Sequence, residues 1–283
     1  AKINRNGIVE YFNYLVNSNL MISFNSRIKK LAAEKKSWLC VGLDIDPDIL
    51  GDYQISNLKK HTFKVIDATR DYAVSYKPNF AFFERWGSIG FKWLEETVKY
   101  IGDDHIKIAD AKRGDIGNTV AQYAQSIFYH FGFDSVTINP YMGTDSILPF
   151  IKNPDKGAFV LCRTSNDSSG QLQDKLVDNI PLYEHVAKLV NDLNLLDNIG
   201  LVVGATACDE LLKIRNIVPD LPILIPGVGA QGGNLSQSLK IGNQAGIGII
   251  NISRAISFAG DMSQVAIRSA AHRYVEQMRE AIV

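Results

Sequence analysis

The sequence predicts a single closed (β/α)8 barrel, and three features of the chain carry this prediction. Short apolar stretches recur eight times, segments of helical length separate them, and polar residues collect where the apolar stretches end. Each stretch is nearly continuous in Val, Ile, Leu and Ala, which is typical of parallel strands covered on both faces. Alternating strands and helices predict a parallel sheet, and eight repeats favour its closure into a TIM barrel.

Taken in chain order, the expected elements begin with one or two helices over residues 7–36. The eight strands are expected within 38–46, 72–79, 105–112, 134–140, 157–165, 199–206, 222–230 and 246–254. Between them, segments such as 87–102 and 180–196 carry apolar residues at three- and four-residue spacings, the pattern of amphipathic helices. The last helix is expected over 263–283.

No Pro/Gly-rich linker or low-complexity segment divides the chain into separate parts. A barrel of this class typically needs about 250 residues. We therefore expect one domain over residues 1–283, with a helical extension at 1–37 and the barrel at 38–283.

Composition excludes several classes of partner and compartment. The 30 basic and 30 acidic residues cancel, which argues against a nucleic-acid partner. The longest apolar runs fall short of the roughly 20 residues of a membrane span, and the first 25 residues lack a signal core. Cys40, Cys162 and Cys208 stand far apart among apolar residues, so we expect buried thiols and a cytoplasmic protein without a membrane partner.

Charged side chains follow the first three strands, at the end of a barrel where functional residues belong. The first strand ends in Asp44, the second in Lys77, and the third in Asp110 and Lys112, with Asp115 just beyond. Because residues two apart on a strand point to the same face, Asp110 and Lys112 are expected to point into the mouth of the barrel. None of the five histidines stands at such an end, so lysine is the expected proton carrier.

A phosphate site is expected after the last two strands. The glycine-rich segment "GVGAQGG" follows the seventh strand and Arg254 ends the eighth, where many barrels bind phosphate. Gln231 and Arg254 supply side-chain donors, and an arginine can bind two phosphate oxygens at once. The pattern therefore predicts a phosphorylated substrate.

Together, "DAKRGDIGNT", "YKPN", "PGVGAQGG" and "SRAI" resemble orotidine 5′-monophosphate decarboxylases, in particular their longer KPN / DAKRGDI branch. The resemblance runs from Asp44 to Arg254. It implies decarboxylation of orotidine 5′-monophosphate to uridine 5′-monophosphate, the last step of de novo pyrimidine synthesis, with no cofactor and no metal.

The resemblance also implies a role for each matched residue. The charged tetrad consists of Lys77, Asp110, Lys112 and Asp115, in which Lys112 stabilises the ring carbanion and protonates it. Asp115 and Thr119 would enter the active site of the neighbouring subunit, which implies a homodimer. The substrate contacts are Asp44 and Lys77 for the ribose, Ser165 or its neighbour Thr164 for the pyrimidine, and Gln231 and Arg254 for the phosphate.

Two other functions fit parts of the pattern. A magnesium-dependent sugar-phosphate decarboxylase or aldolase shares the D-x-K-x-x-D spacing, but such relatives carry an acidic residue where this chain has Lys77, and a cation there disfavours a divalent metal. A catalytically silent barrel that binds phosphate or a nucleotide would leave the lysine between aspartates without a use. Activity towards orotidine monophosphate separates these possibilities.

Overall fold

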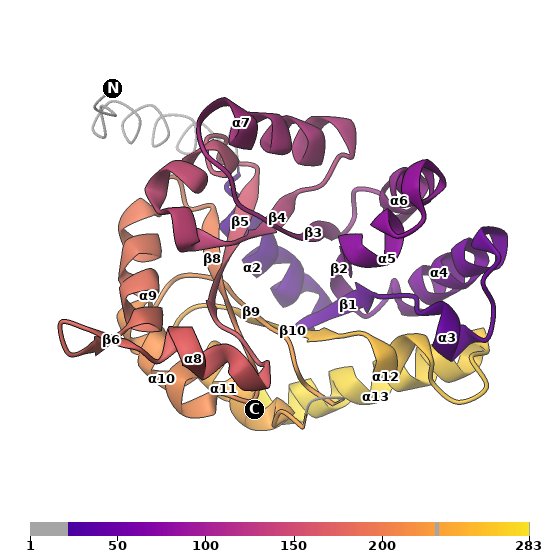
Figure 1. Cartoon of the computed structure of the whole chain (residues 1–283). Coiled ribbons are helices and arrows are strands. Elements are labelled where there is room, and N and C mark those ends of the chain that lie inside the picture. The colour runs from indigo at the N-terminus through magenta and orange to yellow at the C-terminus, as the bar shows by residue number, and fades with distance from the viewer. Residues whose placement is uncertain (1–21, 230–231, 283) are drawn as a thin grey trace.

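Eight parallel strands close into a barrel in the part of the chain described by this computed structural model, residues 22–229 and 232–282 (Figure 1). The strand order around the barrel is β1-β10-β9-β8-β5-β4-β3-β2. The strands are β1 (Leu39–Leu43), β2 (Ala73–Pro78), β3 (Ile106–Arg113), β4 (Ser135–Ile138), β5 (Gly157–Arg163), β8 (Ile199–Val203), β9 (Ile223–Ile225) and β10 (Gly248–Ile252). All start within the expected ranges, and β3 alone runs one residue further, so the predicted fold class is confirmed.

Helices surround the barrel and bury the outer face of its strands (Figure 1). The outer ring consists of α4 (Ile55–Thr69), α6 (Gly87–Ile101), α7 (Gly117–Gln125), α9 (Leu182–Leu193), α10 (Cys208–Ile217), α11 (Leu235–Gly242) and α13 (Gln264–Ile282). Strands β1, β2, β4, β8, β9 and β10 are buried along their whole length. Their continuous apolar sequence thus reflects cover on both faces, as expected.

The alternation of strand and helix is interrupted once, between β4 and β5. Three 3-10 turns, η2 (Pro140–Met142), η3 (Thr144–Ser146) and η4 (Leu148–Phe150), take the place of a longer helix. Prolines at the starts of η2 and η4 lack the N–H that a continuous helix needs. Gly143 between them has a φ of 79°, which a helix does not accommodate.

Shorter elements decorate the loops between the main ones. After α7 the chain forms one π-helical turn, η1 (Ser126–His130). The other short helices and the small antiparallel sheet are α3 (Pro47–Leu50), α5 (Phe80–Glu84), η5 (Asp167–Ser169), α8 (Gly170–Gln173), β6 (Leu176–Val177), β7 (Ile180–Pro181) and α12 (Arg254–Ser257).

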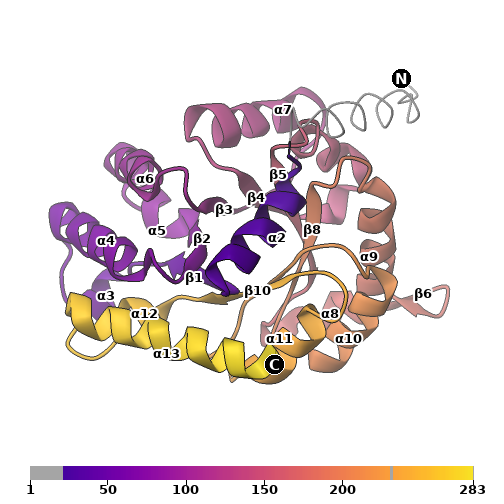
Figure 2. The ribbon, with the colours of Figure 1, turned by 180° about the vertical axis from the view of Figure 1, so that it is seen from behind.

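Helix α2 (Phe24–Lys35) lies across the end of the barrel at which the strands begin (Figure 2). Ser23 caps the helix and also donates to Asp197, at 2.5 Å, just before β8. The ring of Phe24 packs on Gly157 at the start of β5, where a Cβ atom would lie 2.1 Å from the ring. This helix falls in the expected N-terminal extension, of which residues 1–21 lie outside the described part.

The cysteines are free, and Cys40 and Cys162 are buried as expected, whereas Cys208 is only half-buried. Cys208 is the first residue of α10, where its thiol contacts the carbonyl of Ala205. Along 22–229 and 232–282, no helix combines the length and apolarity needed to cross a bilayer.

Arg215, on α10, is a fully buried cation that joins several chain segments. Its guanidinium donates to the five backbone carbonyls of Val218, Pro219, Leu221, Gly242 and Ile247, mostly at 2.7–2.9 Å. Burial lowers the pKa of Arg215 to about 10. The charge is therefore retained at neutral pH, and it ties α10 to α11 and to the loops before β9 and β10.

We predict that Arg215→Met lowers the free energy of unfolding by about 3 kcal/mol or more, because it leaves buried carbonyls without donors. Denaturant unfolding of the two proteins measures the difference. The matched control is Arg268→Met, which removes a half-exposed arginine paired with Asp71 and should change stability little. Equal, small effects of the two changes would contradict a structural role for Arg215.

Candidate active site

Three charged side chains meet where β2 and β3 end. Lys77 donates to Asp110 Oδ2, and Lys112 Nζ donates to Asp110 Oδ1 at 2.5 Å. The side chains of Lys77 and Asp110 are only 5% and 10% exposed, whereas that of Lys112 is 51% exposed. A buried carboxylate is thus held between one buried ammonium group and one that reaches the solvent.

The charges of this cluster support one another. Burial by itself would raise the pKa of Asp110, but the nearby ammonium groups of Lys77 and Lys112 outweigh it and hold that pKa well below its usual range. Burial likewise works to lower the pKa of Lys77, and the carboxylates of Asp110 and Asp44 outweigh it and raise that pKa. Asp110 and Lys77 are therefore both charged at neutral pH.

Strand β3 is irregular at the point where it carries these charges. Ala109 pairs with Val136 and Arg113 with Ile138, so residues 110–112 of β3 lie opposite a single residue of β4, Thr137. This is a β-bulge, a feature that re-aims side chains next to functional sites. Lys112 has a φ of 45°, in the left-handed region. Asp110 and Lys112 do come together as expected, but through this irregular backbone and not through the regular two-residue alternation of a strand.

Asp44 borders the charged cluster from the end of β1. It is half-buried, and its Oδ1 atom is buried without a hydrogen-bond partner among the described residues. Such an orphaned acceptor is well suited to a ligand hydroxyl. The neighbouring polar residues Asp46 and Asn79 instead cap α3 and α5.

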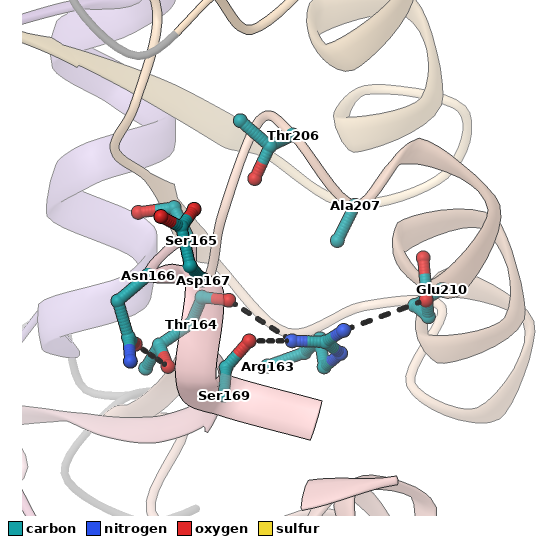
Figure 3. A pocket seen from close by; sticks show the side chains of 9 residues that line it. All are labelled: Arg163, Thr164, Ser165, Asn166, Asp167, Ser169, Thr206, Ala207 and Glu210. Atoms are coloured by element: carbon teal, nitrogen blue, oxygen red, sulfur yellow. Dashed lines mark hydrogen bonds and ion pairs between the residues drawn. The ribbon is translucent and has the colours of Figure 1, made fainter. Parts of the chain in front are cut away.

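The loop after β5 lines a cavity of about 530 Å³ together with the start of α10 (Figure 3). In this loop Thr164 is fully engaged: its N–H donates to Gln173 Oε1 at 2.9 Å and its hydroxyl bonds Gln173 Nε2 and Asn166. Within the described part of the chain, the hydroxyl of Ser165 has no such partner. Of the two candidates for recognising the pyrimidine, Ser165 is therefore the one whose hydroxyl is available for a hydrogen bond.

Arg163, at the end of β5, fastens this loop, and sequence reasoning did not single it out. Its guanidinium donates to the carbonyl of Thr164 and to Ser169, and it lies 3.8 Å from Glu210 on α10 (Figure 3). It also donates to Asp174. The only signal in the sequence is a basic residue just past an apolar strand. Such residues are common in solvated loops that serve no site, so this signal alone does not identify Arg163.

The expected phosphate side is formed by the loops after β9 and β10. Arg254 is exposed and begins α12, whereas Gln231 lies outside the described residues. The flanking Gly229 and Gly232 have φ angles of 82° and 78°, which glycine adopts most readily. His61 Nε2 lies 2.8 Å from the carbonyl of Ser257 and thereby holds α12 against α4.

Asp115 and Thr119 lie on the outer side of the site. Asp115 follows β3 and its carboxylate accepts from the N–H of Ile116 at 2.8 Å, while Thr119 is exposed on α7. In the described chain neither contacts Lys77, Asp110 or Lys112. Within the described part of one chain, three residues of the expected tetrad thus meet, Lys77 and Lys112 each contacting Asp110, and Asp115 does not contact them.

No group of three or more His, Cys, Asp or Glu side chains within residues 22–229 and 232–282 is arranged to hold a metal ion. A divalent cation at Asp110 would need further oxygen ligands beside it. Two ammonium groups, those of Lys77 and Lys112, contact Asp110 instead.

Comparison with known proteins gives a consistent result. The model of the "Orotidine 5'-phosphate decarboxylase / HUMPS family" matches residues 37–268. The orotidine 5′-phosphate decarboxylase of Natronomonas pharaonis is 45% identical over 245 residues, which cover 85% of this chain and 90% of that protein. That of Dehalococcoides mccartyi is 44% identical over 267 residues, or 92% of this chain and 97% of the relative.

Solved structures agree with these sequence matches. The orotidine monophosphate decarboxylase of Leishmania donovani has a TM-score of 0.81 at 37% identity, covering 92% of this chain and 99% of that one. The UMP synthase of the same organism has a TM-score of 0.83 at 39% identity, and the match spans 93% of this chain but only 57% of that longer protein. The chain belongs to the orotidine 5′-phosphate decarboxylase / HUMPS family.

Proposed function

We propose that this chain decarboxylates orotidine 5′-monophosphate to uridine 5′-monophosphate, the last step of de novo pyrimidine synthesis, without a cofactor. The observation that carries the proposal is the buried carboxylate of Asp110 held between Lys77 and Lys112 at the end of the barrel. Two relatives, 46% and 42% identical over 80% and 92% of this chain, are named orotidine 5′-phosphate decarboxylase. The cytoplasmic location expected from the cysteines stays a prediction.

Lys112 carries the chemical step in this proposal. When the bond to the carboxylate breaks, carbon dioxide leaves and the electron pair stays on the ring carbon, in the plane of the ring. The ammonium group of Lys112 stabilises that charge and then donates its proton to the same carbon. Because the Lys112 side chain is 51% exposed, water can return the proton to the amine before the next turnover.

Asp110 and Lys77 prepare the electrostatic environment before the substrate arrives. Asp110 fixes the ammonium of Lys112 by a hydrogen bond of 2.5 Å, and Lys77 balances the buried carboxylate from the other side. Charges that are already in place need no reorganisation when the carbanion forms. We infer that this preorganisation, more than repulsion between Asp110 and the substrate carboxylate, lowers the barrier.

The residues proposed as substrate contacts bind the ribose, the pyrimidine and the phosphate of the nucleotide. Asp44, whose Oδ1 atom lacks a partner among the residues that the structure describes, and Lys77 bind the ribose hydroxyls. Ser165 hydrogen-bonds the pyrimidine, because Thr164 is already hydrogen-bonded to Gln173. Gln231 and Arg254 bind the phosphate, far from the bond that breaks, so that this binding energy favours closure of the site.

A homodimer would complete the site, with Asp115 and Thr119 entering the neighbouring subunit. Exposed apolar side chains on the loop of Asp115 and on the loop after β4 support this proposal: Ile116 is 57% exposed, Tyr141 81% and Met142 52%. The loops that carry them are adjacent, since Asn139 N–H donates to the carbonyl of Arg113 at 2.8 Å. Apolar side chains grouped in this way mark interaction surfaces.

We predict that the wild-type chain consumes orotidine monophosphate in EDTA, followed by absorbance, and that Lys112→Ala lowers kcat/KM by at least about 10³-fold. Lys99→Ala, which removes an exposed lysine of α6, serves as the control and should be without effect. A wild-type chain that is inert in EDTA but acts on a sugar phosphate with magnesium would reveal the lyase alternative.

The two candidates for base recognition predict different results. If Ser165 reads the pyrimidine, Ser165→Ala lowers kcat/KM about tenfold and weakens inhibition by uridine monophosphate, because a hydrogen bond to the ring is lost. Thr164→Val is the matched change at the neighbouring hydroxyl. Normal inhibition in Ser165→Ala together with lost inhibition in Thr164→Val would assign the contact to Thr164.

The shared site predicts complementation between two inactive variants. When Asp115→Asn and Lys112→Ala chains are mixed and their subunits exchange, half of the dimers contain both chains and each has one intact site. Activity should therefore return to about a quarter of the wild-type value per chain. Failure to regain activity, with subunit exchange verified by mass, would place Asp115 in its own chain's site.

A further inference from the structure

Lys112 stands in a backbone conformation that its neighbours must maintain. Its φ of 45° is uncommon for a residue with a side chain, and such positions persist only where the surroundings over-determine them. The β-bulge of β3 places residues 110–112 opposite Thr137, and this irregular pairing gives the Lys112 N–H a side chain as its partner. What holds the bulge therefore also sets where the ammonium group of Lys112 lies.

The side chain of Thr137 supplies that support. Thr137 is 2% exposed, on β4, and its Oγ1 atom accepts from the N–H of Lys112 at 3.0 Å. The same hydroxyl donates to Asp110 Oδ1 at 3.1 Å, a shorter contact than the 3.5 Å to the carbonyl of Ala109. A hydroxyl has one hydrogen to donate and lone pairs to accept, so it can make both bonds at once.

These contacts close a ring around the reactive lysine. Lys112 Nζ also donates to Asp110 Oδ1, at 2.5 Å, so one carboxylate oxygen receives both the ammonium group and the Thr137 hydroxyl. The main-chain nitrogen of Lys112 thus bonds the Thr137 hydroxyl directly, and its side-chain nitrogen bonds the carboxylate oxygen that the same hydroxyl contacts. Asp110 Oδ2 is left to Lys77.

We propose that Thr137 is a positioning residue for the decarboxylation: its buried hydroxyl holds the bulge and thereby aims the Lys112 ammonium group at the reacting carbon. The inference rests on the proposed function, because it needs Lys112 to act in the chemical step. Thr137 acts through Lys112 and Asp110, and it is not assigned any contact with the substrate.

Loss of the Thr137 hydroxyl should affect the chemical step more than it affects binding of the nucleotide. Loss of the hydroxyl leaves the Lys112 N–H without an acceptor and frees the backbone to leave the left-handed region, which moves the ammonium group. Of the residues proposed to bind the nucleotide, Asp44, Ser165 and Arg254 lie on other elements, and Lys77 binds the carboxylate oxygen of Asp110 that Thr137 does not contact. The change should therefore lower kcat far more than it weakens binding of uridine monophosphate.

Thr137→Val is the test, because valine keeps the branched shape and removes only the hydroxyl. We expect kcat to fall about 10- to 100-fold, the effect of one lost buried hydrogen bond and its unpaired group, with inhibition by uridine monophosphate little changed. Thr137→Ser keeps the hydroxyl and should restore most of the activity. Thr97→Val is the matched control, since it removes another fully buried threonine hydroxyl, on α6, away from the site.

Three results would overturn the proposal. They are unchanged kcat in Thr137→Val, equal loss in Thr137→Ser and Thr137→Val, and a loss in Thr97→Val as large as that in Thr137→Val. The second would show that side-chain volume matters and the hydroxyl does not.

A crystal structure of Thr137→Val gives a readout that does not depend on activity. We expect Lys112 to leave the left-handed region and its Nζ atom to separate from Asp110. Retention of both features would refute the role of Thr137 even if the chain had another substrate. A wild-type chain inactive on orotidine monophosphate would instead refute the proposed function, while the crystal structure would still decide whether Thr137 holds the bulge.

Discussion

The buried ion pair between Asp110 and Lys77 is the interaction on which the site depends. Removing a carboxylate from water costs several kcal/mol unless it is paired and hydrogen-bonded. Here two ammonium groups and the Thr137 hydroxyl meet that need, and the pKa of Asp110 stays well below its usual range despite burial. The other oxygen of the Asp110 carboxylate fixes Lys112, whose side chain is half-exposed and would otherwise sample many conformations.

The two ends of the barrel differ in the residues that they carry. At the end where strands begin, α2 seals the interior, Phe24 packs on Gly157, and Arg215 ties the loops before β9 and β10. At the opposite end, the strands finish in charged residues whose positions are set by a rigid sheet. This separation lets the active end carry a bulge and unpaired polar atoms while the rest of the fold supplies the stability.

Two kinds of support hold the proposed site. Strands β2, β3 and β4 position the charges, since Lys77, Asp110, Lys112 and Thr137 are all strand residues and, of the four, Lys112 alone is exposed. Loops hold the groups proposed to contact the nucleotide: Arg163 and Gln173 fasten the segment with Ser165, and His61 supports the short helix that begins with Arg254. The proposed site thus combines groups fixed by the sheet with groups held by hydrogen bonds between loops.

The sequence by itself determined the eight strands, because continuous apolar runs separated by amphipathic segments have few other uses. It also determined that Lys77, Asp110 and Lys112 lie at one end of the barrel, since parallel strands place their carboxyl ends together. Only the tertiary structure decided the bulge at Lys112 and the hydrogen bonds of Thr137, because both depend on the register of β3 against β4. It also decided that Thr164 is engaged by Gln173 and Ser165 is not, and that turns replace a helix after β4. Hydrogen bonds between residues distant along the chain leave no periodic trace in the sequence, so local pattern alone could not predict them.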